Sequence, residues 1–185
     1  MASVPCLPLF HGDAEYEPPK SARDLECTEI DMRLAAELNR TWHSMLPRTD
    51  LGNLLCGNMS AAYGFAYRDR WYGVAIYSQP IVRALCDGKT IELRRLAICN
   101  EAPKNTATRF MAETRKLVRV KYPHLRKVIS YQAVDVHHGT IYKAGNWREV
   151  GKIVDARPQR LPGSKQRATG PLQTKSRKVR WEIDL

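Results

Sequence analysis

Side chains that can donate or accept a proton gather in one short stretch, residues 127–152. Asp135, His137 and His138 stand close together in it, and Tyr142 follows four residues after the second histidine. A tyrosine phenol has an unperturbed pKa of about 10, so it is protonated at neutral pH and can act as an acid. Carboxylate and imidazole groups can take up a proton. This stretch is therefore the first candidate for a catalytic centre, although a packed aromatic on a short helix explains Tyr142 about as well.

Residue patterns predict how the stretch is folded. They indicate a strand over Lys127–Ala133, a polar elbow over Val134–His138 and a short helix over Gly139–Ala144. Gly145 and Asn146 suit the end of that helix, and a further strand is expected over Trp147–Val154. The candidate side chains then lie on the elbow and the short helix, between two strands.

A second candidate is the turn that precedes this stretch. Lys89–Cys99 reads as a strand, and a polar turn leads from Asn100 into a helix that begins near Asn105 or Thr106 and closes at Tyr122. A helix start exposes backbone N–H groups and about half a unit of positive charge, which suits a pyrophosphate. Lys104 and Arg109 would add to that charge. Every helix start has such groups, and no Gly-rich loop strengthens the signal here.

Positive charge is the third feature. The 185-residue chain has a net charge of +11 and a pI near 9.6, which favours a polyanionic partner, most commonly nucleic acid. No acidic residue occurs between Asp155 and Glu182, and prolines and glycines interrupt the segment, so a basic loop over 156–180 is expected. A solvated loop without a partner is the alternative. The candidate nucleic-acid contacts are Arg157, Arg160, Lys165, Arg167, Lys175, Arg177 and Lys178.

The remaining sequence indicates one domain with a sheet. Residues 1–27 are expected to form an N-terminal arm, and residues 28–185 the single domain. Thr28 is expected to cap a helix over Glu29–Thr41, and Met59–Tyr67 with Trp71–Ser78 reads as an antiparallel hairpin. A last strand is expected over Val179–Ile183. Together these elements describe a mixed sheet with helices packed on it.

Composition excludes several classes of protein. No apolar run is long enough to span a bilayer, and the first twenty residues do not resemble a signal peptide, so a cytoplasmic protein is expected. Five cysteines are widely spread and form no C-x-x-C pair, which favours reduced thiols over a disulfide framework or a zinc site.

These motifs together resemble a known family. The order of elements, and above all residues 139–147, is similar to the closing part of the GNAT acyltransferase superfamily. The resemblance is closer still to phage-encoded Mom-like DNA-modification proteins, and it covers roughly residues 32–154. It is carried by Glu92-Leu93-Arg94-Arg95-Leu96, Ala102-Pro103-Lys104-Asn105, Tyr122-Pro123-His124-Leu125, Ile129-Ser130-Tyr131 and His138-Gly139-Thr140-Ile141-Tyr142-Lys143-Ala144.

The resemblance implies an α/β fold of the α+β type with a GNAT-like sheet. That sheet is mixed and mostly antiparallel, with a central splayed parallel strand pair, Ile91–Cys99 and Lys127–Ala133, and helices on both faces. Acetyl-CoA or another acyl-CoA would lie in the slot between the two strands. Backbone groups at Leu96, Ala97 and Ile98 would hold its pantetheine arm, and Lys104, Asn105, Thr106 and Arg109 its pyrophosphate. The usual glycines of the GNAT pyrophosphate turn are absent here.

The resemblance also assigns chemical roles. An amine attacks a thioester carbonyl and a thiolate leaves, and Tyr142 stands where GNAT enzymes commonly place the acid that protonates the sulfur. Asp135, His137 or His138 would serve as the base or anchor the substrate. In the Mom-like group an early histidine and an acid near the elbow are regarded as active-site or metal-binding groups, here His43 and Asp135. Two ligands far apart in sequence do not define a metal site.

Three functions follow as hypotheses. The first is an acyl-CoA-dependent N-acyltransferase that modifies a nucleobase amino group in DNA. The second is a GNAT N-acetyltransferase acting on a protein or a small-molecule amine, which would not need the basic loop. The third is a catalytically silent, GNAT-like nucleic-acid-binding protein. No membrane partner is expected, and the sequence does not indicate the acyl donor, the modified base or the oligomeric state.

Overall fold

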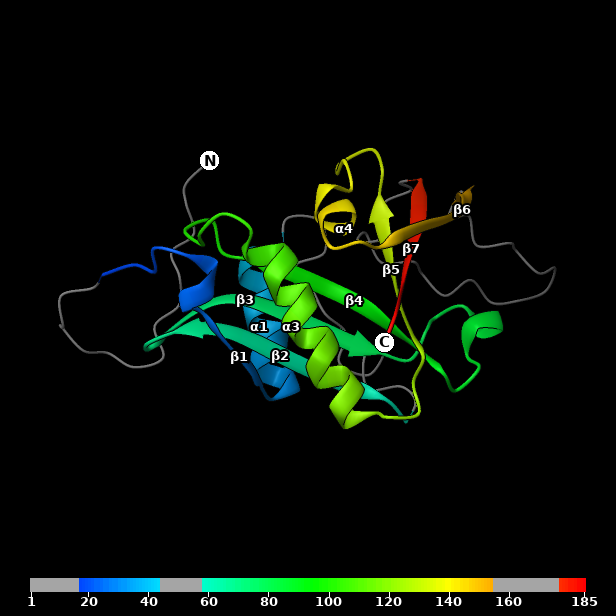
Figure 1. Cartoon of the computed structure of the whole chain (residues 1–185), viewed down its shortest axis with the longest axis horizontal. Helices are drawn as coiled ribbons and strands as arrows, with labels where there is room; N and C mark the ends of the chain where they lie inside the picture. The colour runs from blue at the N-terminus through cyan, green and yellow to red at the C-terminus, as the bar shows by residue number, and fades with distance from the viewer. Residues whose placement is uncertain (1–16, 44–57, 155–176) are drawn as a thin grey trace, which may run out of the picture.

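The structure is a computed structural model that describes residues 17–43, 58–154 and 177–185. Its helices and strands follow the chain as η1 Ala22–Asp24, β1 Glu26–Glu29, α1 Met32–Trp42, β2 Ser60–Tyr67, β3 Arg70–Ser78, η2 Arg83–Leu85, β4 Thr90–Ile98, α3 Thr106–Lys121, β5 Lys127–Ala133, α4 Thr140–Ala144, β6 Arg148–Val154 and β7 Lys178–Asp184 (Figure 1).

The strands form one sheet in the order β1-β2-β3-β4-β5-β7-β6. Every neighbouring pair is antiparallel except β4 and β5, which pair in parallel over Thr90–Leu93 and Lys127–Ser130. Beyond these residues the two strands diverge, and Figure 1 shows β5 rising away from β4. The predicted mixed, mostly antiparallel sheet with a splayed parallel pair is therefore confirmed.

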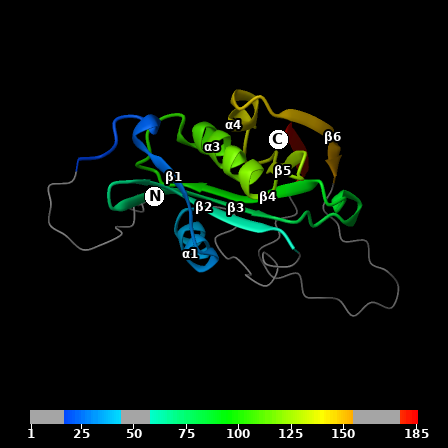
Figure 2. The same ribbon diagram turned by 60° about the horizontal axis from the view of Figure 1, so that its bottom comes forward.

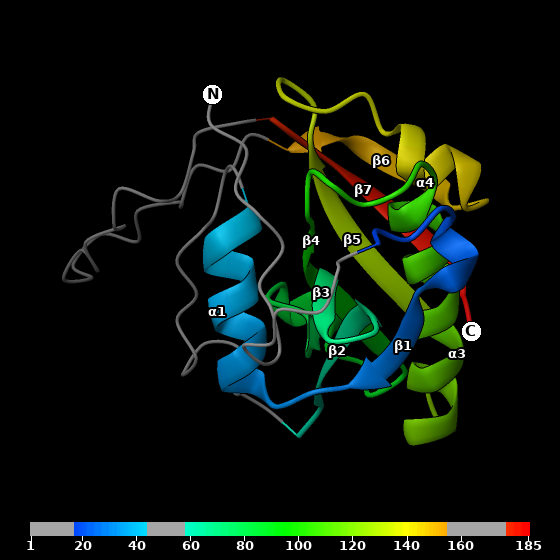
Figure 3. The same cartoon turned by 90° about the vertical axis from the view of Figure 1, so that its left-hand side faces the viewer.

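Helices cover both faces of the sheet. Figures 2 and 3 show α1 on one face and α3 with α4 on the other. Under α1, the buried side chains Leu38, Val74 and Ile76 belong to one core cluster. On the opposite face Phe65 stacks on Phe110 of α3 with ring centroids 4.6 Å apart, inside a second and larger cluster. Helix α1 contacts β2, β3 and β4, so on its face no described helix packs on β5, β7 and β6.

One prediction was wrong at the N-terminal end of α1. The helix was expected to begin at Glu29 after a Thr28 cap, but residues 26–29 form β1, which pairs with β2. The helix begins at Met32 because the Asp31 carboxylate accepts a hydrogen bond of 2.7 Å from the Arg33 N–H. The other predicted elements agree with the structure to within a residue or two at each end.

A β-bulge explains the imperfect alternation of β4. Tyr77 pairs with Leu93 while Ile76 pairs with Arg95, so Arg94 has no partner in the register with β3. A bulge adds one residue to a strand and turns the following side chains to the opposite face. Arg94 and Arg95 lie at this bulge, just after Leu93, the last residue at which β4 pairs with β5.

The cysteines differ from expectation. Cys27 and Cys86 are free, but Cys99, at the end of β4, is disulfide-bonded, so the prediction of reduced thiols was wrong there. The described residues include no helix long and apolar enough to cross a membrane.

Candidate active site

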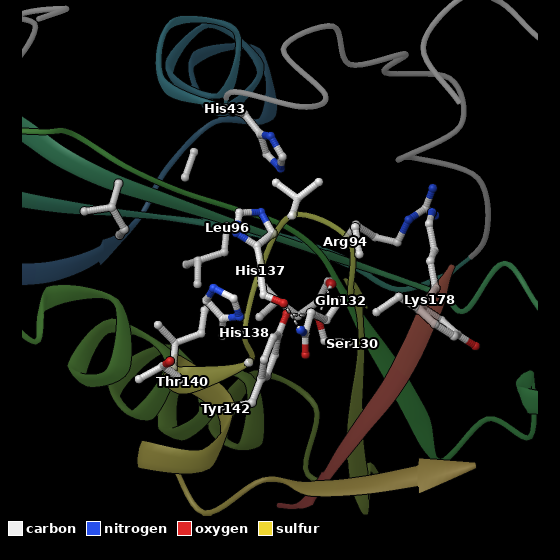
Figure 4. A pocket seen from close by; sticks show the side chains of 18 of the residues that line it. His43, Arg94, Leu96, Ser130, Gln132, His137, His138, Thr140, Tyr142 and Lys178 are labelled. Atoms are coloured by element: carbon white, nitrogen blue, oxygen red, sulfur yellow. Dashed lines mark hydrogen bonds between the residues drawn. The ribbon is translucent and has the colours of Figure 1, made fainter. Parts of the chain in front are cut away.

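A cavity of about 530 Å³ opens where β4 and β5 diverge, and we refer to it as the slot (Figure 4). It is lined by β4, β5, the elbow of residues 134–138, α4, the end of α1 and the first residue of β7. The lining residues are Trp42, His43, Leu93, Arg94, Leu96, Ala97, Ile98, Asn100, Ser130, Tyr131, Gln132, Ala133, Val136, His137, His138, Gly139, Thr140, Ile141, Tyr142 and Lys178.

Tyr142 brings a phenol to this cavity from α4. Its side chain is 8% exposed, and its hydroxyl lies 2.9 Å from the Ser130 Oγ. Ser130 donates its own hydroxyl proton to the Leu93 carbonyl at 3.1 Å. A hydroxyl has a single proton to donate, so the phenol must donate to Ser130 and not the reverse. The parallel end of β4 and β5 thus fixes both the position and the proton of Tyr142.

Two tryptophans hold the Tyr142 ring. Trp181 of β7 stacks on it with centroids 5.2 Å apart and planes 7° apart, and Trp147 meets it edge-on at 5.5 Å and 77°. Burial raises the pKa of the phenol, while the hydrogen bond with Ser130 lowers it, and the net shift is upward. The ring is therefore both a packed core aromatic and a group that stays protonated at neutral pH.

Gln132 connects this aromatic group to the elbow. Its Oε1 accepts a hydrogen bond of 2.7 Å from the Trp181 indole N–H, and its Nε2 donates to the His137 carbonyl. Gly139 lies against the same groups with a φ of +71°. A Cβ at this position would lie 2.6 Å from Gln132 Oε1 and 2.8 Å from Trp181 Cζ2, so only glycine fits.

His43 reaches the slot from the opposite face, as the residue that follows α1. Figure 4 shows it across the cavity from Tyr142. Burial, followed by the positive charge of Arg95 and the neighbouring His137, lowers the pKa of His43 to about 4. The imidazole is therefore neutral at neutral pH and a weaker base than an ordinary histidine.

The elbow divides the remaining predicted catalytic residues. His137 and His138 line the slot, whereas Asp135 does not. The Asp135 carboxylate accepts hydrogen bonds from the backbone N–H of Arg177 at 3.1 Å and from its guanidinium at 3.1 and 3.3 Å. Asp135 thus ties the elbow to the start of β7. In the described part of the chain, no group of three or more His, Cys, Asp or Glu side chains could hold a metal.

The predicted donor-binding residues lie along β4 and the start of α3. Leu96, Ala97 and Ile98 line the slot, beyond the last residue at which β4 pairs with β5. Asn105 precedes α3 with a φ of 66°, which asparagine tolerates better than most residues, and Thr106 donates its hydroxyl to the Pro103 carbonyl at 2.7 Å. Lys104 is exposed.

Arg109 has a different surrounding from the one expected. Its guanidinium donates to the carbonyls of Ala22 and Leu25, so it fastens the segment before β1 to α3. Together with Asn105 it also lines a second cavity, of about 500 Å³, between α3 and α4. Arg109 is therefore engaged by backbone carbonyls of the protein, whereas the sequence predicted it as a pyrophosphate contact.

The predicted nucleic-acid contacts are only partly described. Arg157, Arg160, Lys165, Arg167 and Lys175 lie outside the described residues. Arg177 pairs with Asp135, and Lys178, the first residue of β7, lines the slot.

Sequence reasoning did not single out Ser130, Gln132 or Trp181 as parts of the site, and it named Lys178 only as a nucleic-acid contact. A signal for two of them was present, because Ser130 and Gln132 are polar residues at alternate positions of a strand whose neighbours are apolar. A buried polar side chain requires a partner. For Trp181 and Lys178 no local pattern could indicate which strand they would pair with.

Comparisons with known proteins agree with this geometry. The family model described as the Mom protein family matches residues 24–178. A Bacillus subtilis acetyltransferase solved with CoA is 14% identical, with a TM-score of 0.57 over 87% of this chain and 97% of the other. Spermidine N-acetyltransferase from Vibrio cholerae, solved with CoA and spermine, is 13% identical with a TM-score of 0.57 over 88% and 96%.

A GNAT family acetyltransferase from Elizabethkingia anophelis with acetyl-CoA bound is 9% identical, with a TM-score of 0.57 over 88% and 99% of the two chains. At these identities the likeness establishes a GNAT-like fold. No curated protein matches the sequence.

Proposed function

Because the chain belongs to the Mom protein family and has a GNAT-like fold, we propose that it is an acyl-CoA-dependent N-acyltransferase that modifies a nucleobase amino group in DNA. The observation that carries the proposal is the buried phenol of Tyr142 at the point where β4 and β5 separate, with its proton directed to Ser130. DNA and acyl-CoA meet in the cytoplasm, where we expect the protein to act.

The slot fits the extended arm of an acyl-CoA. On the side of β4 that faces β5, pairing ends at Leu93, so no described strand occupies the position beside residues 96–98. A chain with amide groups can bind such a strand edge as a further strand would. The exposed start of α3 follows directly and suits the pyrophosphate. When bound, the donor would supply an activated acyl group as a thioester.

Side chains of the protein would donate and accept the protons of the reaction. Tyr142 holds a proton at neutral pH, and turning its O–H from the Ser130 Oγ into the slot would let it give that proton to a departing sulfur. The Ser130 hydroxyl is positioned to keep the phenol oriented, since it is itself fixed by the Leu93 carbonyl. On the other side of the slot, the neutral His43 imidazole would orient the attacking amine and serve as a weak base, and Figure 4 shows His137 and His138 between His43 and Tyr142.

DNA as the acceptor is supported by charge and family. A net charge of +11 favours a polyanion, and Lys178 carries positive charge into the slot itself. A base must leave the helical stack to reach a buried reactive group, so we expect a single-stranded or flipped nucleotide.

Mass spectrometry of nucleosides tests the proposal. DNA from cells that express the wild-type protein is expected to contain a new, heavier nucleoside, and Tyr142→Phe is expected to reduce its yield by about 100-fold or more, as for loss of a general acid. DNA binding should not change.

Tyr77→Phe is the matched control, since the buried Tyr77 hydroxyl shares a 2.7 Å hydrogen bond with Thr114 outside the slot. Both variants lose one buried hydroxyl, but only Tyr142→Phe loses a group in the slot. Equal yields from Tyr142→Phe and Tyr77→Phe would contradict the acid role. An acylated protein or polyamine without a modified nucleoside would instead identify an amine N-acetyltransferase, and no acyl transfer at all would indicate a nucleic-acid-binding protein.

A further inference from the structure

Positive charge gathers at one side of the slot, where β4 and β7 contribute basic side chains. Arg94, at the bulge of β4, and Lys178, at the start of β7, both line the slot, and Figure 4 shows the two side chains on the same side of it. Arg95 follows Arg94 directly, and its charge acts on both Lys178 and His43. We refer to Arg94, Arg95 and Lys178 as the cation cluster.

One carboxylate faces this cluster. The Glu92 Oε1 lies 3.4 Å from the Arg94 Nε, and its Oε2 accepts a hydrogen bond of 3.1 Å from the Ile81 N–H. Both side chains of the ion pair are less than a tenth exposed. Arg94 also donates to the Ser78 hydroxyl at 3.1 Å. Glu92 and Ser78 therefore form direct contacts with Arg94, whereas Arg95 and Lys178 are only partly compensated by the more distant charge of the same Glu92.

Arg95 and Lys178 lack a comparable partner. Arg95 donates one N–H to the Arg94 carbonyl at 2.7 Å, but its Nε is buried with no hydrogen-bond partner among the described residues. Burial, followed by repulsion from Arg94, lowers the pKa of Arg95 to about 10. Lys178 forms no ion pair within the described part of the chain, and burial and Arg95 lower its pKa as well.

Such a group is costly unless it binds an anion. Buried charges in proteins are paired or coordinated, because desolvation removes the water that would otherwise stabilise them. Here Arg94 and Lys178 line a cavity that is open enough to admit a ligand, Arg95 is near enough for its charge to act on Lys178, and these three cations share the carboxylate of Glu92. A phosphate group carries the charge and the acceptor oxygens that the arginine and the lysine of the cavity wall can hold together, and the nearby charge of Arg95 adds to the attraction.

We propose that the cation cluster binds a phosphate group of the acceptor nucleotide and so positions its base between His43 and Tyr142. This inference rests on the proposed function, because it assumes a nucleotide as the acceptor. The phosphates of the acyl donor are the other source of the same chemistry. Their expected site, the turn at residues 100–106, follows the far end of β4, whereas Arg94 and Arg95 lie in the middle of that strand.

Binding of small nucleotides tests the cluster without any acyl transfer. Calorimetric titrations would compare the four 2′-deoxynucleoside 5′-monophosphates, their nucleosides and CoA, using the full-length wild-type protein and the Lys178→Gln variant. Lys178 has no described hydrogen-bond partner to lose, so the fold should be retained. The matched control is Arg119→Gln, which removes the same charge from an exposed position on α3.

The preferred monophosphate is expected to bind wild type more tightly than its nucleoside, and Lys178→Gln is expected to weaken it by about 10-fold or more, as for a lost hydrogen bond to a charged group. Arg119→Gln should leave it within twofold, Lys178→Arg should largely restore it, and CoA should bind all variants alike. A monophosphate that binds no better than its nucleoside would overturn the inference. So would a loss of CoA affinity in Lys178→Gln with nucleotide affinity unchanged.

Failure of this inference can be told apart from failure of the proposed function. If Lys178→Gln binds nucleotides normally while wild type still modifies DNA, the cluster has been misassigned and the function stands. If Lys178→Gln loses nucleotide affinity while wild type leaves DNA unmodified, the cluster binds phosphate and the proposed reaction is wrong.

Discussion

The two sides of the slot are built differently. On the α4 side, the polar groups of Tyr142, Ser130, Gln132 and Trp181 are joined by hydrogen bonds, and the aromatic rings are stacked. On the α1 side, the three positive charges of the cation cluster act on one another and on a single carboxylate, that of Glu92, which forms an ion pair with Arg94. The first side is complete in the protein alone, whereas the second leaves charge for a ligand to neutralise.

The α4 side is therefore suited to keep a proton on Tyr142, and the α1 side is suited to receive the substrate. A saturated hydrogen-bond network keeps Tyr142 in one position and one protonation state. A bound anion neutralises a cluster of partly paired cations, so the cluster favours binding of the acceptor nucleotide through its phosphate. Changes on the α4 side should therefore affect stability strongly, and changes on the α1 side should affect it less than they affect binding.

The largest loss of stability is expected from Gly139→Ala. Adding a Cβ at a φ of +71° costs about 1–2 kcal/mol, and the clash with Gln132 and Trp181 should raise the total to about 3–5 kcal/mol. Urea denaturation would measure it. Gly88→Ala is the matched control, because Gly88 has the same φ but nothing within 4 Å. Equal losses in the two variants would show that the α4 side adapts easily.

Gln132→Leu is expected to cost about 1–3 kcal/mol, since it leaves the buried Trp181 N–H without an acceptor. Trp181→Phe keeps an aromatic ring beside Tyr142 and removes that N–H. In a double-mutant cycle measured by thermal unfolding, the second change should cost less in the Gln132→Leu background. Additive losses would mean that the hydrogen bond between Gln132 and Trp181 contributes little to the stability of the protein.

Stability is expected to fall as the pH is lowered from about 6.5 to about 4, because of His43 on the α1 side. The pKa of His43 in the folded protein is lowered to about 4, so in this range the unfolded chain binds a proton that the folded chain does not. The free energy of unfolding should fall by about 1–3 kcal/mol across this range, and above pH 6.5 none of that stability is lost. His43→Gln should flatten the pH profile of the unfolding free energy, whereas His124→Gln, at an exposed position, should not.

The smallest effect is expected from Asp135→Asn. The Asp135–Arg177 pair is exposed on both sides, with side chains 44% and 60% accessible, and such pairs contribute less than about 1 kcal/mol. We expect the yield of modified nucleoside to stay within a few-fold of wild type. A loss as large as that of Tyr142→Phe would instead return Asp135 to a direct part in catalysis.

Local patterns were enough to predict most of the elements. The alternation in residues 127–133 and the helical spacing in residues 106–121 gave β5 and α3 with nearly their observed bounds. Strand β1 was missed because four residues with only Cys27 apolar carry little alternation, and its pairing with β2 decides it. The position of Arg109 was also outside the reach of local patterns, since its partners are 84 and 87 residues away.

The sequence by itself determined the strands, the elbow with its histidines and the short helix that carries Tyr142, because these depend on neighbours within a few residues, and its resemblance to a known family indicated the type of sheet. Only the tertiary structure decided what surrounds the phenol. The register of β7 against β5 sets Trp181 opposite Ser130 and Lys178 opposite Ala133. That register depends on contacts between strands separated by more than forty residues, where side-chain packing and hydrogen bonds, and not local conformational preference, select the arrangement.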